Sequence, residues 1–341
     1  MPAPAPSLPM PAGALPRLGY GTGTFWGHYR TGVPKTEVVR LRPLSEPSLS
    51  HLLTSPSDAA AQNSALVAAI RSAIAAGVRH IDCAEMYGSE LSVGEGIRQA
   101  IAAGEITRPE LWVTSKALNE SKESAATLRA ACAGSLQRLG LEYLDLYLLH
   151  SPFGAPEGDD RHGEAELSAE RQQQIWGWME ALHADGLARH IGCSNHRVSD
   201  LQHLCATARV RPAVNQVEFN PLLLGATEPL LAFCKAEAIV VEAYSALSSL
   251  VYDGAKGNAA LDAAVEQIAA ALGRSAGAVL LRWNLHKGTV VISTSTKPAR
   301  VEEALGVFEF ELSEDQIAEI DGAAREGKVH KQFWQKSLAK Q

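Results

Sequence analysis

The chain has 341 residues, a length that allows either two domains or one large fold around a single core. Its 31 Lys and Arg residues stand against 38 Asp and Glu residues, and this net charge of −7 argues against a surface that collects nucleic-acid phosphates. Hydrophobic residues make up 46% and charged residues 20%, which is typical of a globular protein and excludes a disordered chain.

The cysteines and the N-terminus bear on the compartment. The five cysteines are widely spaced and form no CxxC pair, which favours reduced thiols in the cytoplasm over a disulfide framework or a zinc site. The opening sequence MPAPAPSLPMPAG has neither the basic region nor the apolar run of a signal peptide, and no run of 18 apolar residues follows. We therefore expect a cytoplasmic protein with no membrane association, whose residues 1–12 form a disordered or extended Pro/Ala tail.

Eight short runs with strand character follow one another along the chain. Segments with helical periodicity separate them, and several of these segments end in the glycine that commonly caps a helix, as at Gly77, Gly140 and Gly273. Eight strand–helix units without a linker predict one closed (β/α)8 TIM barrel over residues 13–341, rather than two doubly wound domains. The runs are RLGYG (17–21), VRHID (78–82), LWVTSK (111–116), YLDLYLLH (143–150), RHIGCSN (189–195), AVNQVE (213–218), IVVEAY (239–244) and TVVIS (289–293).

The length beyond that of a minimal barrel is concentrated in a few segments. Residues 27–62 are rich in Pro, Ser and Thr and form an extended loop after the first strand. This loop leaves the face of the barrel that carries active sites, so it is either a lid that shapes the substrate site or a tolerated surface insertion. Residues 151–167 and the C-terminal tail are expected to border the same opening.

Polar residues close most of the predicted strands. In a (β/α)8 barrel the functional side chains lie at the C-terminal ends of the strands. Each of these residues alone is explained as a polar group that meets water, but together they offer an acid, a base, an imidazole and two amides. They are Asp82, Lys116, His150, Asn195, Gln216, Tyr244 and Ser293.

The glycine-rich sequence GYGTGTFWG (19–27) allows two interpretations. It follows a strand, as a dinucleotide-binding loop does. The Rossmann fingerprint also requires a helix that begins at the loop and an acidic residue about 20 positions later, whereas this loop continues into the long 27–62 segment. Glycines that form a tight turn at the barrel mouth are the alternative.

The segment GVRHIDCAEMYGSELSVGEGIR (77–98) is more specific. It places Asp82 at a strand end and Tyr87 in the next loop, before a helix that begins near Glu90. LWVTSK, YLDLYLLHSP, IGCSN, NQVEFNP and VEAYSAL follow in order, and over about residues 17–325 the chain resembles the aldo-keto reductase superfamily, with Val78 where an aromatic residue is usual. The resemblance implies a TIM barrel and an NADPH-dependent carbonyl reductase that transfers a hydride from nicotinamide to an aldehyde or ketone.

The resemblance implies a catalytic tetrad of Asp82, Tyr87, Lys116 and His150. Hydride transfer to a carbonyl leaves an alkoxide that must be protonated, so the site needs a general acid, and Tyr87 is the candidate. The Lys116 ammonium is expected to lower the Tyr87 pKa from its ordinary value of about 10, while Asp82 holds the ammonium in place. His150 is expected to donate a hydrogen bond to the carbonyl; a buried structural histidine is the alternative.

The resemblance also implies an NADPH site, with use of NADH left open and no metal. Ser194, Asn195 and Gln216 would bind the nicotinamide carboxamide, and Tyr244 would stack on its ring. Arg300, whose forked guanidinium suits a phosphate, matches a position that binds the 2′-phosphate, although Thr294 stands where a lysine is usual. The further cofactor positions are Thr22, Gly23, Thr24, Asp82, Ser245, Leu247, Ser249, Ser293, Ser295 and Glu303.

The substrate pocket departs from the common pattern of the superfamily. Trp26, Tyr87, His150 and Ser151 are expected to contact the substrate, and Ser151 replaces a tryptophan found in many relatives. This replacement predicts a roomier or more polar pocket. Three segments offer substitute aromatic lining or simple core packing: Trp26, Trp176 and Phe333–Trp334.

The same residues allow a narrower family assignment and two alternative functions. The long first loop and the ending VHKQFWQKSLAK are loosely similar to a fungal branch of the superfamily that includes conjugated polyketone reductases. We expect a monomer or weak homo-oligomer that acts on a small carbonyl compound. The alternatives are a nicotinamide-binding redox sensor or regulatory subunit with weak catalysis, and a Schiff-base aldolase that uses Lys116.

Overall fold

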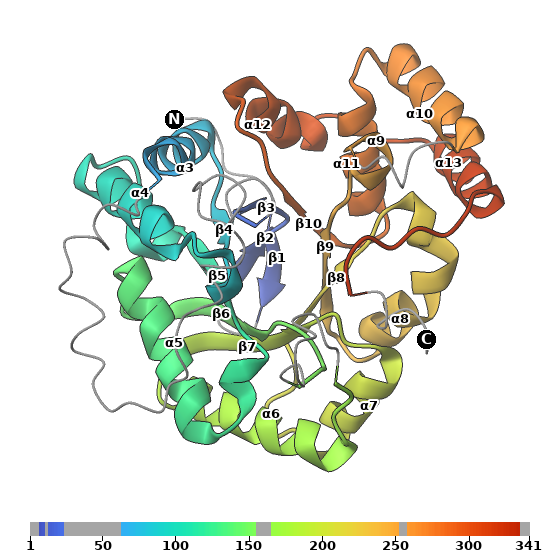
Figure 1. Ribbon diagram of the computed structural model, residues 1–341. Helices are drawn as coiled ribbons and strands as arrows, with labels where there is room; N and C mark the ends of the chain where they lie inside the picture. The colour runs from blue at the N-terminus through green and yellow to red at the C-terminus, as the bar shows by residue number, and fades with distance from the viewer. Residues whose placement is uncertain (1–6, 11–12, 24–62, 155–164, 252–257, 335–341) are drawn as a thin grey trace.

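Eight parallel strands form a closed barrel in this computed structural model, which describes residues 7–10, 13–23, 63–154, 165–251 and 258–334 (Figure 1). The strands neighbour one another in the order β10-β3-β4-β5-β6-β7-β8-β9. Each lies within or next to one of the eight predicted runs, so the predicted (β/α)8 barrel is confirmed. The strands are β3 (Leu18–Gly21), β4 (His80–Asp82), β5 (Trp112–Ala117), β6 (Leu144–Leu149), β7 (Ala188–Ser194), β8 (Val214–Glu218), β9 (Val240–Tyr244) and β10 (Val290–Ser293).

Helices surround the barrel and bury its outer face (Figure 1). Three of them end where the sequence predicted, because Gly77, Gly140 and Gly273 adopt the left-handed conformation that closes a helix. The α-helices are α3 (Ser64–Ala76), α4 (Glu90–Ala102), α5 (Ala125–Leu139), α6 (Ala169–Ala184), α7 (Val198–Thr207), α8 (Leu224–Ala236), α9 (Ser248–Val251), α10 (Ala259–Leu272), α11 (Ala276–His286), α12 (Pro298–Leu305) and α13 (Glu314–Glu326).

Short 3-10 turns connect several of these elements on the barrel's two faces. They are η2 (Glu85–Tyr87), η3 (Arg108–Glu110), η4 (Glu120–Lys122), η5 (Pro221–Leu223) and η7 (Gly306–Phe308). Among them η2 follows β4 directly, and η4 follows β5, so both lie at the C-terminal ends of strands. This is the face on which the predicted functional residues lie.

A hairpin of β1 (Ser7–Met10) and β2 (Gly13–Pro16) precedes the barrel. Leu15 is fully buried and packs against Leu146 and Leu148 inside the barrel and against Val214 and Val290, which begin β8 and β10. The hairpin therefore closes the N-terminal end of the barrel, opposite the functional face. The sequence analysis predicted no strands here, because these short segments show no alternation of apolar and polar residues.

Some predictions fall outside the described residues or concern the chain as a whole. The 27–62 loop, Thr24 and Trp26 lie outside them.

All five cysteines are unpaired, and four of them are buried. Among the described residues no cluster of His, Cys, Asp or Glu is arranged to hold a metal ion. No single described helix is long and apolar enough to cross a membrane, although α10 and α11 taken together would be, with a bend of 99° between them.

Candidate active site

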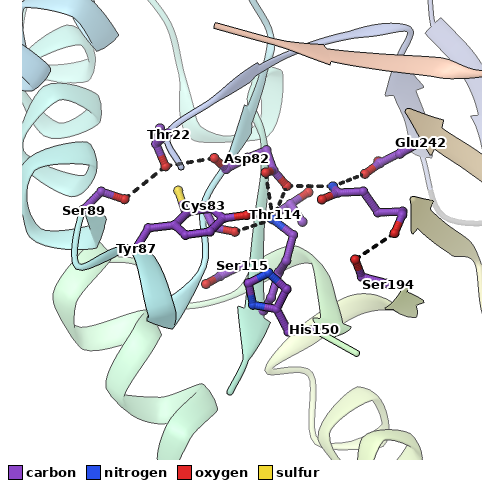
Figure 2. Close-up of polar contacts among 12 residues, drawn as sticks. Thr22, Asp82, Cys83, Tyr87, Ser89, Thr114, Ser115, His150, Ser194 and Glu242 are labelled. Atoms are coloured by element: carbon purple, nitrogen blue, oxygen red, sulfur yellow. Dashed lines mark hydrogen bonds and ion pairs between the residues drawn. The ribbon is translucent and has the colours of Figure 1, made fainter. Parts of the chain in front are cut away.

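A buried ion pair lies at the centre of the functional face. Asp82 ends β4, where it pairs with Thr114 of the neighbouring β5, and Lys116 lies two residues further along β5 on the same face as Thr114. The Lys116 Nζ is 2.7 and 2.8 Å from the two carboxylate oxygens of Asp82, and it also donates to the Cys83 carbonyl at 2.8 Å (Figure 2). Burial acts to lower the Lys116 pKa, but the Asp82 carboxylate and Tyr87 raise it above its ordinary value. Lys116 is therefore a fixed positive charge at neutral pH.

Tyr87 presents its hydroxyl to this ammonium. It ends η2, and the Lys116 Nζ donates to its oxygen at 3.4 Å. Lys116 acts to lower the Tyr87 pKa, as the sequence predicted, but burial has the larger effect and the pKa is raised overall. The expected net lowering is therefore wrong for this structure. The phenol is protonated at neutral pH, which is the state that a general acid requires.

The glycines of β3 and of the loop that follows it allow other side chains to approach the backbone closely. A Cβ on Gly23 would lie 3.0 Å from the Tyr87 ring, and one on Gly19 would lie 2.5 Å from Ile292. None of Gly19, Gly21 and Gly23 has a positive φ, so close approach rather than a tight turn explains these glycines. The closed barrel also excludes the Rossmann interpretation of this loop.

Thr22 and Ser89 fix the backbone beside the pair. The Thr22 hydroxyl donates to the Asp82 carbonyl at 2.9 Å and lies 3.0 Å from the Ser89 hydroxyl (Figure 2). Thr22 is fully buried, so its hydroxyl joins β3 to the start of the loop after β4. Of its predicted neighbours along the cofactor, Gly23 is described and Thr24 is not.

His150 follows β6 directly and faces Tyr87. The two rings meet edge to face, with their centroids 5.6 Å apart. Burial, together with the charges of Lys116 and Lys122, holds the His150 pKa well below its ordinary value, so the imidazole is neutral. The buried His150 Nδ1 has no hydrogen-bond partner among the described residues. A neutral imidazole keeps one N–H to donate, which suits a carbonyl oxygen placed between His150 and Tyr87.

The residues predicted to hold the nicotinamide are linked to one another. Asn195 has a φ of 60°, and its Nδ2 donates to the His150 carbonyl at 3.0 Å and to the Ser194 hydroxyl at 2.9 Å. Its Oδ1 accepts a hydrogen bond of 2.8 Å from the Tyr244 hydroxyl. Ser194 in turn donates to the Gln216 carbonyl at 2.7 Å. The structure thus brings together all four residues predicted for this part of the site.

Glu242 is a site residue that the sequence analysis missed. The Gln216 Nε2 donates to both Asp82, at 2.9 Å, and Glu242, at 2.7 Å (Figure 2). Glu242 is fully buried, and burial followed by the Asp82 charge raises its pKa to about 8. A signal for it exists in the sequence, since Glu242 precedes Tyr244 by two residues in the apolar run IVVEAY and shares its face of the strand.

The remaining cofactor candidates gather on the loops that follow the neighbouring strands β9 and β10. Ser245 has a φ of 56°, and its carbonyl accepts a 2.8 Å hydrogen bond from Ser248 at the start of α9. The Thr294 hydroxyl oxygen is buried without a partner among the described residues. The others lie at the end of β10, on the same two loops or on the two short helices α9 and α12: Ser293, Leu247, Ser295, Ser249, and the exposed Arg300 and Glu303.

The Ser151 side chain is buried between the loop after β6 and the loop after β5. Its hydroxyl donates to the Asn119 side chain at 2.7 Å and accepts from the Phe153 amide at 3.2 Å. Lys122 is buried beneath this loop and donates to the carbonyls of Ser151, at 2.8 Å, and Phe153. Burial lowers the Lys122 pKa to about 7. The Ser151 hydroxyl therefore serves the shape of the loop after β6.

Aromatic side chains reach the site from the C-terminal segment, which comprises residues 327–334 after α13. Trp334 stacks on Phe153, with ring centroids 6.3 Å apart, and lies 5.9 Å from His150. The centroid of the Phe333 ring lies 6.1 Å from that of the Tyr244 ring. Trp176, by contrast, is buried on α6 and donates to the Val210 carbonyl, so it packs in the core. Of the described residues proposed as substitute aromatic lining, Phe333 and Trp334 reach the site.

Glu218 fastens this segment to the barrel. It ends β8, and its carboxylate accepts hydrogen bonds from the backbone amides of Gln332, at 3.0 Å, and Phe333, at 2.9 Å. The Lys331 ammonium lies 3.9 Å from the same carboxylate. No local pattern in the sequence indicates this role of Glu218, because its partners lie more than 110 residues away in the chain.

Comparison with known proteins agrees with this geometry. A profile of the "Aldo/keto reductase family" matches residues 53–325, most of the chain. The chain belongs to the aldo/keto reductase family. It is 37% identical to the uncharacterized oxidoreductase YtbE of Bacillus subtilis, over 76% of this chain and 84% of that protein. It is 36% identical to an NAD/NADP-dependent indole-3-acetaldehyde reductase of Schizosaccharomyces pombe, over 76% and 84% of the two chains.

Solved structures of the family have the same fold. A Bombyx mori aldo-keto reductase (AKR2E4) in complex with NADP superposes with a TM-score of 0.75 at 30% identity, covering 96% of this chain and 95% of that one. The resemblance inferred from the sequence is thus confirmed. This aldo/keto reductase is an NAD(P)H-dependent oxidoreductase of the class that acts on carbonyl groups.

Proposed function

We propose that this aldo/keto reductase is an NADPH-dependent carbonyl reductase in which Tyr87 is the general acid. One observation carries the proposal: the Tyr87 hydroxyl lies 3.4 Å from an ammonium that Asp82 holds by both carboxylate oxygens, and the neutral His150 ring faces it. An acid, a fixed cation and a neutral hydrogen-bond donor thus converge on one point. Carbonyl reduction needs this set.

The proposed steps assign one task to each residue. His150 donates a hydrogen bond that orients the carbonyl and polarises it. Reduced nicotinamide, when bound, supplies a hydride to the carbonyl carbon. Tyr87 gives its proton to the resulting alkoxide, and the Lys116 ammonium stabilises the phenolate that remains. Tyr87 then regains a proton from solvent, and the product is an alcohol.

The residues present fit a nicotinamide dinucleotide. The Tyr244 ring, whose hydroxyl donates to Asn195, offers a face for the nicotinamide. The Thr294 hydroxyl, which is buried without a partner among the described residues, lies on the loop before α12. Arg300 of α12 is exposed and makes no ion pair with a described residue. A hydroxyl and a guanidinium suit a 2′-phosphate, which supports NADPH over NADH. The NADP complex of the Bombyx mori enzyme supports the same choice.

The test is cofactor oxidation by a panel of aliphatic aldehydes, aryl ketones, α-keto lactones and sugars, with NADPH and NADH in parallel. We expect at least one class to be reduced at an ordinary enzymatic rate of about 1 s⁻¹ or more. NADPH should be preferred, and R300M should raise the KM for NADPH while leaving that for NADH unchanged. NADPH binding without turnover of any class would instead favour the redox-sensor interpretation, and borohydride trapping at Lys116 would favour the aldolase.

We also propose that the protein works in the cytoplasm as a monomer or weak homo-oligomer on a small carbonyl substrate. The five unpaired cysteines support a reducing compartment. Size-exclusion chromatography with light scattering checks the oligomeric state.

A further inference from the structure

The side-chain amide of Gln216 is hydrogen-bonded through its NH2 group and not through its oxygen, as far as the described residues show. Both protons of its NH2 group are used, one by the Asp82 carboxylate and one by Glu242. Its Oε1 accepts no hydrogen bond from a described residue, although Gln216 is otherwise buried. The amide therefore keeps one acceptor for a partner that comes from outside the chain.

The two carboxyl groups select this orientation of the amide. If the amide turned by 180°, its oxygen would face the Asp82 carboxylate, and acceptor would meet acceptor there. Asp82 alone could hold the NH2 group with a single bond, but Asp82 also receives the Lys116 ammonium. The second bond, to Glu242, fixes the amide from the neighbouring strand, where Gln216 and Glu242 are paired in register.

Glu242 is energetically unfavourable at this position, because its carboxyl group is removed from water. It is fully buried in the barrel, and its Oε1 has no partner among the described residues. The charged groups that act on it are Asp82 from β4 and Lys116 from β5, which already neutralise each other; β10 places Val290 beside it. An apolar residue would fill such a position without an unsatisfied polar atom. The hydrogen bond to Gln216 is the contact that an apolar residue would lose.

We propose that Glu242 is a positioning residue for the cofactor: together with Asp82 it clamps the Gln216 NH2 group, so that Gln216 Oε1 faces the site as a fixed acceptor for the nicotinamide carboxamide. The inference rests on the proposed function, since it assigns the free acceptor of Gln216 to the NH2 group of a nicotinamide. Glu242 itself does not touch the cofactor, and it acts through Gln216.

The test compares two substitutions at Glu242 by quenching of protein fluorescence with NADPH. E242Q keeps an acceptor oxygen within reach of Gln216 Nε2, whereas E242L has a similar volume and no acceptor. We expect E242Q to bind NADPH within about twofold of the wild type and E242L to bind it about tenfold more weakly, the effect of one hydrogen bond. E242V repeats the apolar change with a smaller side chain, in case leucine does not fit.

A double-mutant cycle with Q216L shows whether the effect passes through Gln216. We expect the E242L/Q216L double variant to bind NADPH no more weakly than Q216L alone, because the clamp has nothing left to hold. Additive losses, or a folded E242L and E242V with the wild-type Kd, would overturn the inference alone. No quenching with the wild type would overturn the proposed function and this inference with it.

Discussion

Asp82 and Lys116 show how a single buried pair organises the site. Lys116 is fully buried, and its ammonium donates to Asp82, Cys83 and Tyr87. Without Asp82 the ammonium would be a buried charge with only neutral acceptors, and such a charge is strongly destabilising. In the proposed mechanism the pair therefore serves stability and chemistry together, since it fixes the cation beside Tyr87.

We predict that D82A lowers the free energy of unfolding by about 3–5 kcal/mol, the cost of leaving one member of a buried ion pair alone. The D82A/K116M double variant should be more stable than D82A, because it buries no unpaired charge. Urea denaturation followed by circular dichroism measures both variants. A D82A/K116M variant as unstable as the sum of its two single variants would contradict the account.

Glu242 makes a prediction about pH. Its pKa is raised from an ordinary 4.5 to about 8 in the folded protein, so the folded state keeps a proton that the unfolded chain releases between these values. The stability that Glu242 contributes is thus fully present below pH 4.5 and is lost as the pH rises toward 8.

The E242Q variant has no titrating group at this position and therefore has no such loss. The stability of E242Q relative to the wild type should increase from pH 5 to pH 8.5 by roughly 4 kcal/mol, since each pKa unit corresponds to about 1.4 kcal/mol and this interval covers most of the shift. Urea denaturation at the two pH values checks this, and a constant difference would refute it.

At the scale of elements, the sequence predicted what depends on local pattern. The strand runs alternate with capped helices, and polar residues close the strands, so the barrel and the tetrad on its functional face followed from the sequence together with its resemblance to the superfamily. Glu242 and Glu218 did not follow. Their roles depend on partners that only the closed barrel and the folded C-terminus bring to them, and no local pattern records such partners.

The C-terminal segment is the element most open to a direct test. It carries Phe333 and Trp334 to the site, and Glu218 holds it through two backbone amides. E218A should release the segment, and it should raise the KM for carbonyl substrates about tenfold while leaving the Kd for NADPH within about twofold. W334A is the matched variant, because it removes the aromatic contact with the segment still fastened. An E218A variant with unchanged KM would show that the segment does not shape the substrate site.

At the scale of the whole molecule, the barrel separates stability from chemistry. Its N-terminal end is closed by Leu15 on the β2 strand, whereas every residue of the tetrad lies at the opposite end. We therefore expect a substitution at the N-terminal end of the barrel to have little effect on binding at the opposite end. The length of the chain first allowed two domains, but the described residues form one barrel, with the β1–β2 hairpin at one end and the segment around Phe333 at the other.

This separation gives a prediction for Leu15. L15A should lower the free energy of unfolding by about 2–5 kcal/mol, because it leaves a cavity among Leu146, Leu148 and Val214. The Kd for NADPH and the KM for the carbonyl substrate should stay within about twofold of the wild type. Thermal denaturation and fluorescence titration measure the two properties. A loss of cofactor binding in a folded L15A would show that the two ends of the barrel are coupled.

The central claim is that Tyr87 donates the proton in carbonyl reduction, and Y87F tests it most directly. The variant keeps the ring that faces His150 and loses only the hydroxyl near Lys116. The measurement is kcat for NADPH-dependent reduction of the best substrate of the panel, with the Kd for NADPH taken from the same preparation by fluorescence quenching. We predict a loss in kcat of about 10²–10⁴-fold, the usual contribution of a general acid, with the Kd for NADPH within about twofold of the wild type. Turnover by Y87F at the wild-type rate would contradict the account.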